Sequence, residues 1–179
     1  MTKQTMSPPS LDASRRRIKI ERTYVATIDD VWDLWTTKEG IESWWGPDGF
    51  AVQVRTLDLR AGGELQYAMT ATAPAQVAFM KKAGMPLTTE VRITYTDVVA
   101  HRRLEYTQLA DFIPGVEPYK LVTTVELYPD AQSARMVLTF DAMHDEQWTQ
   151  LAVMGRESEL GKLAKLLELR RLTHSSGCS

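Results

Sequence analysis

Cysteine is almost absent from this chain of 179 residues, which contains a single copy, Cys178. One thiol cannot form an intramolecular disulfide, so a framework of disulfide bridges is excluded. Cys178 also lies next to the C-terminus, in a polar stretch, and a thiol in such a tail is a poor candidate for a catalytic nucleophile. The fold must therefore be stabilised by its packed interior.

Histidine is also scarce, with His101, His144 and His174 as the three copies. None of them has the spacing or the neighbouring ligands of a metal site. The cluster His144-Asp145-Glu146 comes nearest, but its acidic residues fall where a helix begins and favour the positive end of the helix dipole. The chain also has no phosphate-binding loop, dinucleotide fingerprint or G-x-S-x-G motif. We therefore expect no metal and no cofactor.

Long apolar runs and a strong net charge are missing as well. The net charge is −2, and no run approaches the roughly 18 apolar residues that a membrane span needs. The polar start, with Pro8-Pro9, lacks the core of a signal peptide. Arg15-Arg16-Arg17 has no aromatic partners, so we interpret it as the solvated start of a strand. We expect a soluble, cytoplasmic protein that neither binds nucleic acid nor inserts into a membrane.

The composition is that of an ordinary globular domain, with 44% hydrophobic and 25% charged residues. We expect one folded domain at residues 17–172, between disordered tails at 1–16 and 173–179. The start of this domain alternates apolar and polar residues from Arg17 to Val25, which predicts a strand. Thr27 and Thr37 then have the positions of N-caps of two short helices.

A series of short strands follows, without long helices between them, which predicts an antiparallel meander. The apolar phase slips between Val54 and Leu57, as it does at a β-bulge. Two connections are longer than hairpins need. Residues 74–84 begin with proline and end with glycine, which favours an inserted helix. Residues 109–118 form a proline-containing loop that either acts as a lid or simply packs on the body. The expected strands lie at 51–60, 65–69, 88–98, 104–106, 119–128 and 134–141.

The last segment predicts one long helix over residues 145–171, because only single glycines interrupt it. At 100° per residue, its apolar stripe contains Trp148, Ala152, Leu160, Leu163 and Leu167. Arg156 falls in the middle of this stripe, with Glu159 on the same side. Two interpretations remain open: the two side chains pair across one helical turn, or Arg156 points into a pocket toward an anionic or carbonyl group of a ligand.

The segments DVWDLWT (30–36), TKEGI (37–41), WWGP (44–47) and LDLRAGGEL (57–65) resemble the START-like, or SRPBCC, superfamily. More narrowly, they resemble bacterial homologues of the activator of heat-shock-protein-90 ATPase. The resemblance implies an α+β helix-grip fold, in which a curved antiparallel sheet with two short helices wraps around a long C-terminal helix and an apolar pocket. Relatives commonly have tryptophan after the glycine at 155, where this chain has Arg156, so the polarity of the pocket is expected to differ.

Large aromatic and methionine side chains provide candidates for the wall of such a pocket. Each of them singly is better explained as core packing, but a curved sheet and one helix cannot close on each other without a space unless large side chains fill it. Tyrosine would add hydroxyl groups to the wall. The predicted ligand-binding residues are Trp44, Trp45, Phe50, Tyr67, Met69, Met80, Tyr95, Tyr106, Phe112 and Arg156.

The leading hypothesis for function is the binding of a small apolar or aromatic molecule between the sheet and the last helix. An enzyme of the cyclase, aromatase or hydrolase kind is the first alternative, supported by the superfamily, but no general base can be named and catalysis is not expected. A cochaperone-like or regulator-binding module is the second alternative. A homodimer is left open.

Overall fold

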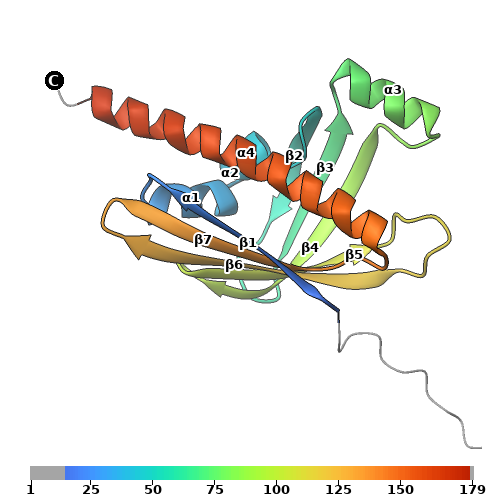
Figure 1. Cartoon of the computed structure of the whole chain (residues 1–179), viewed down its shortest axis with the longest axis horizontal. Helices are drawn as coiled ribbons and strands as arrows, with labels where there is room; N and C mark the ends of the chain where they lie inside the picture. The colour runs from blue at the N-terminus through green and yellow to red at the C-terminus, as the bar shows by residue number, and fades with distance from the viewer. Residues whose placement is uncertain (1–14, 178–179) are drawn as a thin grey trace, which may run out of the picture.

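The structure, a computed structural model, describes residues 15–177 of the chain. Within this range the elements follow the predicted order of strand, two short helices, meander with an inserted helix, and long last helix (Figure 1). Of the expected tails, residues 1–14 and 178–179 lie outside the described residues. The bounds are β1 (Arg17–Tyr24), α1 (Ile28–Thr36), α2 (Lys38–Trp44), β2 (Phe50–Leu57), β3 (Glu64–Ala71), α3 (Pro74–Lys82), β4 (Thr88–Val99), β5 (Arg103–Ala110), β6 (Tyr119–Asp130), β7 (Ser133–Asp141) and α4 (Glu146–Ser176).

The two predicted helix caps are present. The hydroxyl of Thr27 accepts a hydrogen bond from the Asp30 N–H at 3.0 Å, and it donates one to the Asp30 carboxylate at 2.9 Å. The hydroxyl of Thr37 accepts from the Gly40 N–H at 3.0 Å. These bonds satisfy backbone donors that a helix leaves free in its first turn, so the sequence signal for both short helices was local and sufficient.

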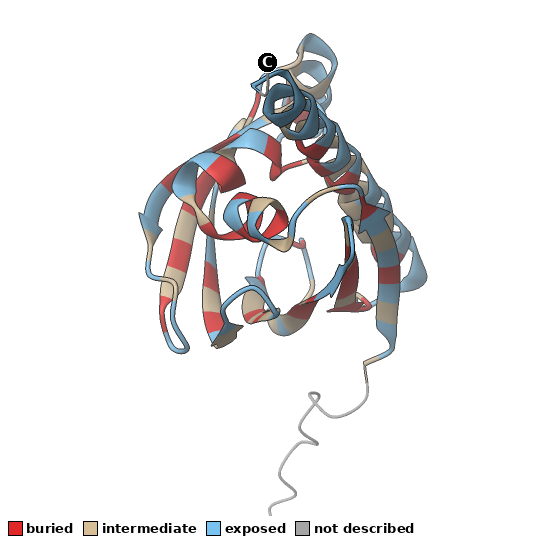
Figure 2. Cartoon of the chain, turned by 90° about the vertical axis from the view of Figure 1, so that its left-hand side faces the viewer, coloured by how far each residue is buried: buried red, intermediate tan, exposed pale blue. Residues whose placement is uncertain are grey.

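The strands form one antiparallel sheet of order β1-β7-β6-β5-β4-β3-β2 in the described residues. The predicted meander is thus confirmed, and β1 pairs with β7 at the end of it. The register between β2 and β3 shifts between Val54 and Thr56, where the apolar phase slips in the sequence. Buried and exposed positions alternate along the strands (Figure 2), so one face of the sheet is the interior and the other meets solvent.

The last helix is longer than predicted. Asp145 caps it by accepting from the Trp148 N–H at 2.8 Å, but it ends at Ser176 instead of Arg171. In the extra turn, the hydroxyls of Ser175 and Ser176 donate to backbone carbonyls four residues earlier, at 3.0 Å each. Residues 173–176 were expected in a tail, but the structure continues the helix through them.

The expected N-terminal tail is corrected at its last residue. The carbonyl of Arg16 accepts a hydrogen bond from the Ala142 N–H at 2.7 Å, and its guanidinium pairs with Glu146 at 2.7 Å. Arg16 is therefore attached to the junction between β7 and α4. This junction is far from Arg16 in the sequence, so the contact could not be predicted from local patterns.

Helix α4 lies across the concave side of the sheet (Figure 1) and packs against α1 and α2. Its second half is buried through Leu160, Leu163 and Leu167. Trp148 and Ala152 of the predicted stripe are only half-buried, so the first half of α4 covers the sheet less closely. None of the helices in residues 15–177 has the length and apolarity of a membrane span.

Candidate functional site

Arg156 points to the interior, where its side chain is 21% exposed. One guanidinium nitrogen, Nη1, donates to Glu159 Oε2 at 3.2 Å, and the other, Nη2, donates to the Tyr106 hydroxyl at 3.4 Å. The guanidinium also lies 5.8 Å from the centre of the Phe140 ring. The pairing with Glu159 across one helical turn is thus present, and the contact of Arg156 with a ligand stays a prediction.

The charge of Arg156 is retained in this position. Burial alone lowers the pKa of a guanidinium, but the nearby Tyr106 oxygen and the Glu159 carboxylate raise the pKa of Arg156 above its usual value. The site therefore holds a permanent cation whose charge is balanced by one carboxylate.

Aromatic side chains surround this ion pair. The Trp45 ring lies 5.5 Å from that of Tyr67 and 6.1 Å from that of Tyr106, and Tyr106 is 6.4 Å from Tyr95. Tyr95 and Tyr106 stand directly opposite each other on β4 and β5, a cross-strand pairing that brings two rings to one spot of the inner face. Trp44 joins the group at 6.0 Å from Trp45. The structure therefore brings together six of the predicted residues: Trp44, Trp45, Tyr67, Tyr95, Tyr106 and Arg156.

Two polar atoms of this cluster have no hydrogen-bond partner in the described part of the chain. They are the indole Nε1 of Trp45 and the hydroxyl of Tyr95, and their residues are 5% and 1% exposed. A buried polar group without a partner costs about 1–3 kcal/mol, so such atoms are rare and need an explanation. Burial raises the pKa of Tyr95 and of Tyr67 above the usual value for tyrosine, so both remain neutral phenols.

The corner between α2 and β2 is attached to α4 beside Arg156. Glu159 Oε1 accepts from the Gly46 N–H at 3.0 Å, and Lys162 Nζ donates to the Gly46 carbonyl at 2.8 Å. Gly46 has φ +83°, and a Cβ atom there would meet Phe50 and Met69 at 3.6 Å each. Phe50 and Met69, both half-buried, therefore lie next to the cluster. Glu159 was missing from the predicted site, although its helical position beside Arg156 was visible in the sequence.

Met80 and Phe112 do not join this cluster. Met80 is buried on α3, which stands at the same end of the molecule as the start of α4 (Figure 1). Phe112 is 44% exposed on the loop at 111–118, and its ring lies 6.2 Å from Trp148. The neighbouring Ile113 is buried, so this loop is anchored by one apolar residue while the other contacts the start of α4.

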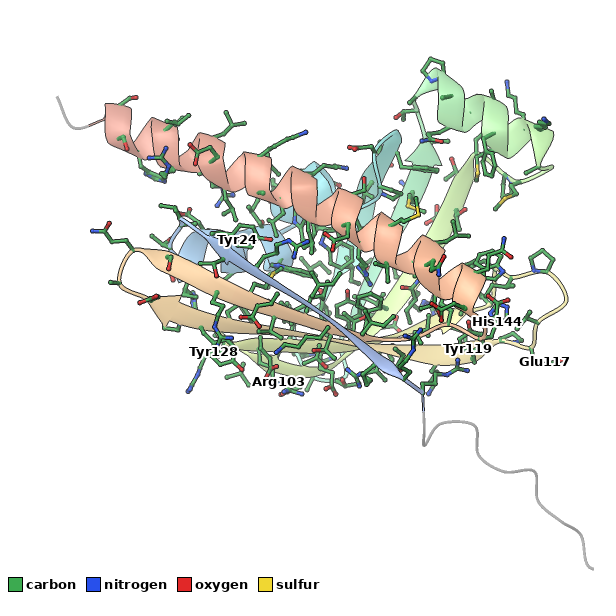
Figure 3. The ribbon with its side chains drawn as sticks, in the orientation of Figure 1. Tyr24, Arg103, Glu117, Tyr119, Tyr128 and His144 are labelled. Atoms are coloured by element: carbon green, nitrogen blue, oxygen red, sulfur yellow. The ribbon has the colours of Figure 1, made fainter. Side chains whose placement is uncertain are left out.

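A second polar cluster at the start of α4 was not predicted. The Tyr119 hydroxyl accepts from the His144 N–H at 3.0 Å and lies 3.1 Å from His144 Nδ1, while His144 Nε2 is 3.2 Å from Asp145 Oδ2. Figure 3 shows Tyr119 and His144 together below this end of the helix. These contacts join β6 to the corner between β7 and α4. Across residues 15–177, no three His, Cys, Asp or Glu side chains gather closely enough to hold a metal ion.

A groove of about 790 Å³ lies at the opposite end of α4. It is formed by the β1–α1 junction, the β6–β7 hairpin and the last turns of the helix, with Asp29, Asp130 and Arg171 among its lining residues. None of the predicted ligand-binding residues lines this groove. The sequence therefore did not predict it, because its walls come from three distant segments of mostly polar composition.

The sequence model of one protein family, described as "Activator of Hsp90 ATPase homolog 1-like protein", matches residues 25–168. This chain belongs to that family. The family membership expected from the tryptophan-rich opening and the helix-grip fold expected with it are both confirmed. A comparison with curated proteins finds no match.

Solved structures of bacterial proteins have the same fold. A protein from Chromobacterium violaceum is 23% identical, with a TM-score of 0.70, over 85% of this chain and 96% of its own. A protein from Arthrobacter aurescens is 23% identical, with a TM-score of 0.68, over 89% and 91%. The AHSA1 protein of Silicibacter pomeroyi is 19% identical, with a TM-score of 0.67, over 87% and 99%. At these identities the likeness concerns the fold, and function has to be argued from the site.

Proposed function

We propose that this protein is a cytoplasmic binding protein for a small apolar or aromatic molecule, held between the sheet and the first half of α4. The observation that carries the proposal is the incomplete burial of two apolar side chains of this half-helix, Trp148 and Ala152, although their neighbour Thr149 is buried. Trp148 and Ala152 belong to the same apolar stripe as Leu160 and Leu163, yet they are half-buried where the leucines are buried. An apolar face that the protein does not cover fully is the usual mark of a ligand site.

The surroundings of this half-helix fit the same proposal. On the sheet, Met69 and Val91 are apolar residues that are only partly buried against the core. An exposed apolar side chain, Phe112 on the loop at 111–118, lies at the same end, with its ring 6.2 Å from that of Trp148. The Arg156 and tyrosine cluster follows one turn further along α4 and would supply polar contacts at the inner end of the site.

A titration with Nile red, a neutral dye that fluoresces in apolar surroundings, tests this proposal. We expect wild-type protein to bind the dye, and Ala152→Trp to weaken binding by about tenfold or more, because the larger side chain fills the proposed site. Gln150→Trp is the matched control, since Gln150 is exposed on the same turn, and it should bind as wild type does. Thermal unfolding of both variants shows that they are folded. Equal dye affinity in wild type and Ala152→Trp would contradict the proposal.

The description of the family favours a second candidate, a cochaperone-like module. This function would require stimulation of an Hsp90 ATPase by the purified protein. Measuring the ATPase rate of a purified bacterial Hsp90, with and without a molar excess of this protein, separates the two candidates. Stimulation that survives Ala152→Trp would support the module and argue that the proposed ligand site is not needed for it.

A further inference from the structure

The cluster around Arg156 contains more hydrogen-bond donors than acceptors. Trp45 Nε1 can only donate, and it has no partner among the described residues. The Tyr95 hydroxyl is also unpartnered. The Tyr106 oxygen already accepts from Arg156, so its own proton remains available as a donor. Three neutral donors thus lie in one continuous group of rings.

The strongest acceptor of the cluster, the Glu159 carboxylate, is already engaged. Glu159 Oε2 accepts from Arg156 and Glu159 Oε1 accepts from the Gly46 N–H. The carboxylate is only 16% exposed, and its two bonds fix it against the helix and the α2–β2 corner. The Glu159 carboxylate accepts neither the indole proton of Trp45 nor the hydroxyl proton of Tyr95, and both of these atoms lack a partner in the described residues.

The charges of the cluster are also balanced before any ligand arrives. Arg156 contributes one positive charge and Glu159 one negative charge, 3.2 Å apart. A ligand carboxylate placed beside Arg156 would bring a second anion to the same guanidinium and leave one buried negative charge without compensation, which is costly. A neutral carbonyl or ether oxygen would accept from the free donors without this cost.

We infer that the ligand of this site is a neutral molecule, with an apolar or aromatic body and a carbonyl-type or ether-type acceptor that binds the donors of Trp45, Tyr95 and Tyr106. This inference rests on the proposed function and narrows its ligand class. It assigns Glu159 a role in specificity, because this carboxylate neutralises Arg156 and thereby rejects acids. Of the anionic and carbonyl groups considered from the sequence, this inference favours the second.

Three naphthalenes with one body and different substituents test the inference: 2-acetylnaphthalene, which is a neutral acceptor, naphthalene, which has no acceptor, and 2-naphthoate, which is an anion at pH 7.5. Binding is measured by displacement of Nile red and by the shift of indole N–H signals in ¹⁵N NMR spectra. We expect the ketone to bind about tenfold more tightly than naphthalene, and 2-naphthoate to bind at least about tenfold more weakly than the ketone.

Single-residue variants test whether the Tyr95 hydroxyl and the Glu159 carboxylate cause this selectivity among the three compounds. Tyr95→Phe should weaken the ketone about three- to tenfold while naphthalene affinity stays unchanged, because only the hydroxyl is removed. Glu159→Gln should raise the affinity for 2-naphthoate about tenfold, since it leaves Arg156 without its counter-charge. Glu168→Gln, on the exposed side of α4, is the control and should change none of the three affinities.

The possible outcomes distinguish a wrong ligand class from a wrong binding function. Binding of 2-naphthoate as tight as that of the ketone, or equal affinity for all three compounds, would overturn the inference and leave the binding function standing. Failure of all three to displace Nile red from a protein that binds the dye would also overturn the inference. Absence of dye binding by wild-type protein would remove the proposed function itself.

Discussion

Two arginine–glutamate pairs on α4 have the same spacing but differ in burial, and therefore in their expected contribution to stability. Arg156 with Glu159 and Arg171 with Glu168 are both separated by three residues. The side chains of the first pair are 21% and 16% exposed, and those of the second are 43% and 53% exposed. Solvent screens the second pair, whereas the first depends on its partner to remain charged in the interior.

Removing the inner arginine should therefore destabilise the protein. We expect Arg156→Leu to lower the free energy of unfolding by about 2–4 kcal/mol, because it leaves the Glu159 carboxylate partly buried without its cation. Urea unfolding followed by circular dichroism measures the change. Arg171→Leu is the control on the same helix and should show no measurable change. An Arg156→Leu variant as stable as wild type would mean that Glu159 finds other partners or solvent at no cost.

The short helices are linked by one hydroxyl group. Thr37 lies between α1 and α2, where its Oγ accepts from the Gly40 N–H at 3.0 Å and donates to the Asp33 carbonyl at 2.8 Å. The two helices approach so closely that a Cβ atom on Gly40 would lie 2.4 Å from this carbonyl. Because Trp44 and Trp45 follow directly, the angle between α1 and α2 determines where the tryptophans enter the core.

The threonine at this junction can be tested by removing its hydroxyl. Thr37→Ala should cost about 1–2 kcal/mol of unfolding free energy, since one hydroxyl serves both as the N-cap of α2 and as a donor to α1. Thr37→Ser keeps the hydroxyl and should stay within about 0.5 kcal/mol of wild type. Chemical unfolding of the two variants makes the comparison. Equal losses in both would assign the role to the threonine methyl group instead.

At the scale of the whole molecule, three buried tyrosines keep their phenol protons in the folded protein. Burial raises the pKa of Tyr24, Tyr67 and Tyr95 above the ordinary value near 10. Tyr24 lies beneath α4 at the end of β1 (Figure 3), and the other two lie on β3 and β4. Three strands of the sheet thus contain a phenol whose ionisation would affect stability at high pH.

Stability should consequently fall in alkali. Below pH 10 these phenols are neutral in both states, but above it the unfolded chain releases protons that the folded chain retains, so the free energy of unfolding decreases as pH rises. We expect the urea midpoint to drop between about pH 10 and 11. The drop should be smaller in Tyr95→Phe. A urea midpoint that stays constant over this range, or phenolate absorbance at 295 nm from all tyrosines in folded protein, would contradict this expectation.

Much of the architecture was determined by local sequence. Caps at Thr27, Thr37 and Asp145, the phase slip after Val54, and the proline and glycine around α3 each act within a few residues, so the order of elements could be predicted before any contact was known. The place of Arg156 on the apolar stripe of α4 also followed from helical periodicity, but the direction of its side chain did not. Only the tertiary structure decided the distant partners, because Tyr106 and Gly46 come from separate segments that meet Arg156 and Glu159 when α4 packs across the curved sheet. The incomplete cover of the first half of α4, the anchoring of Ile113 and the groove at the other end depend in the same way on how distant elements fit together.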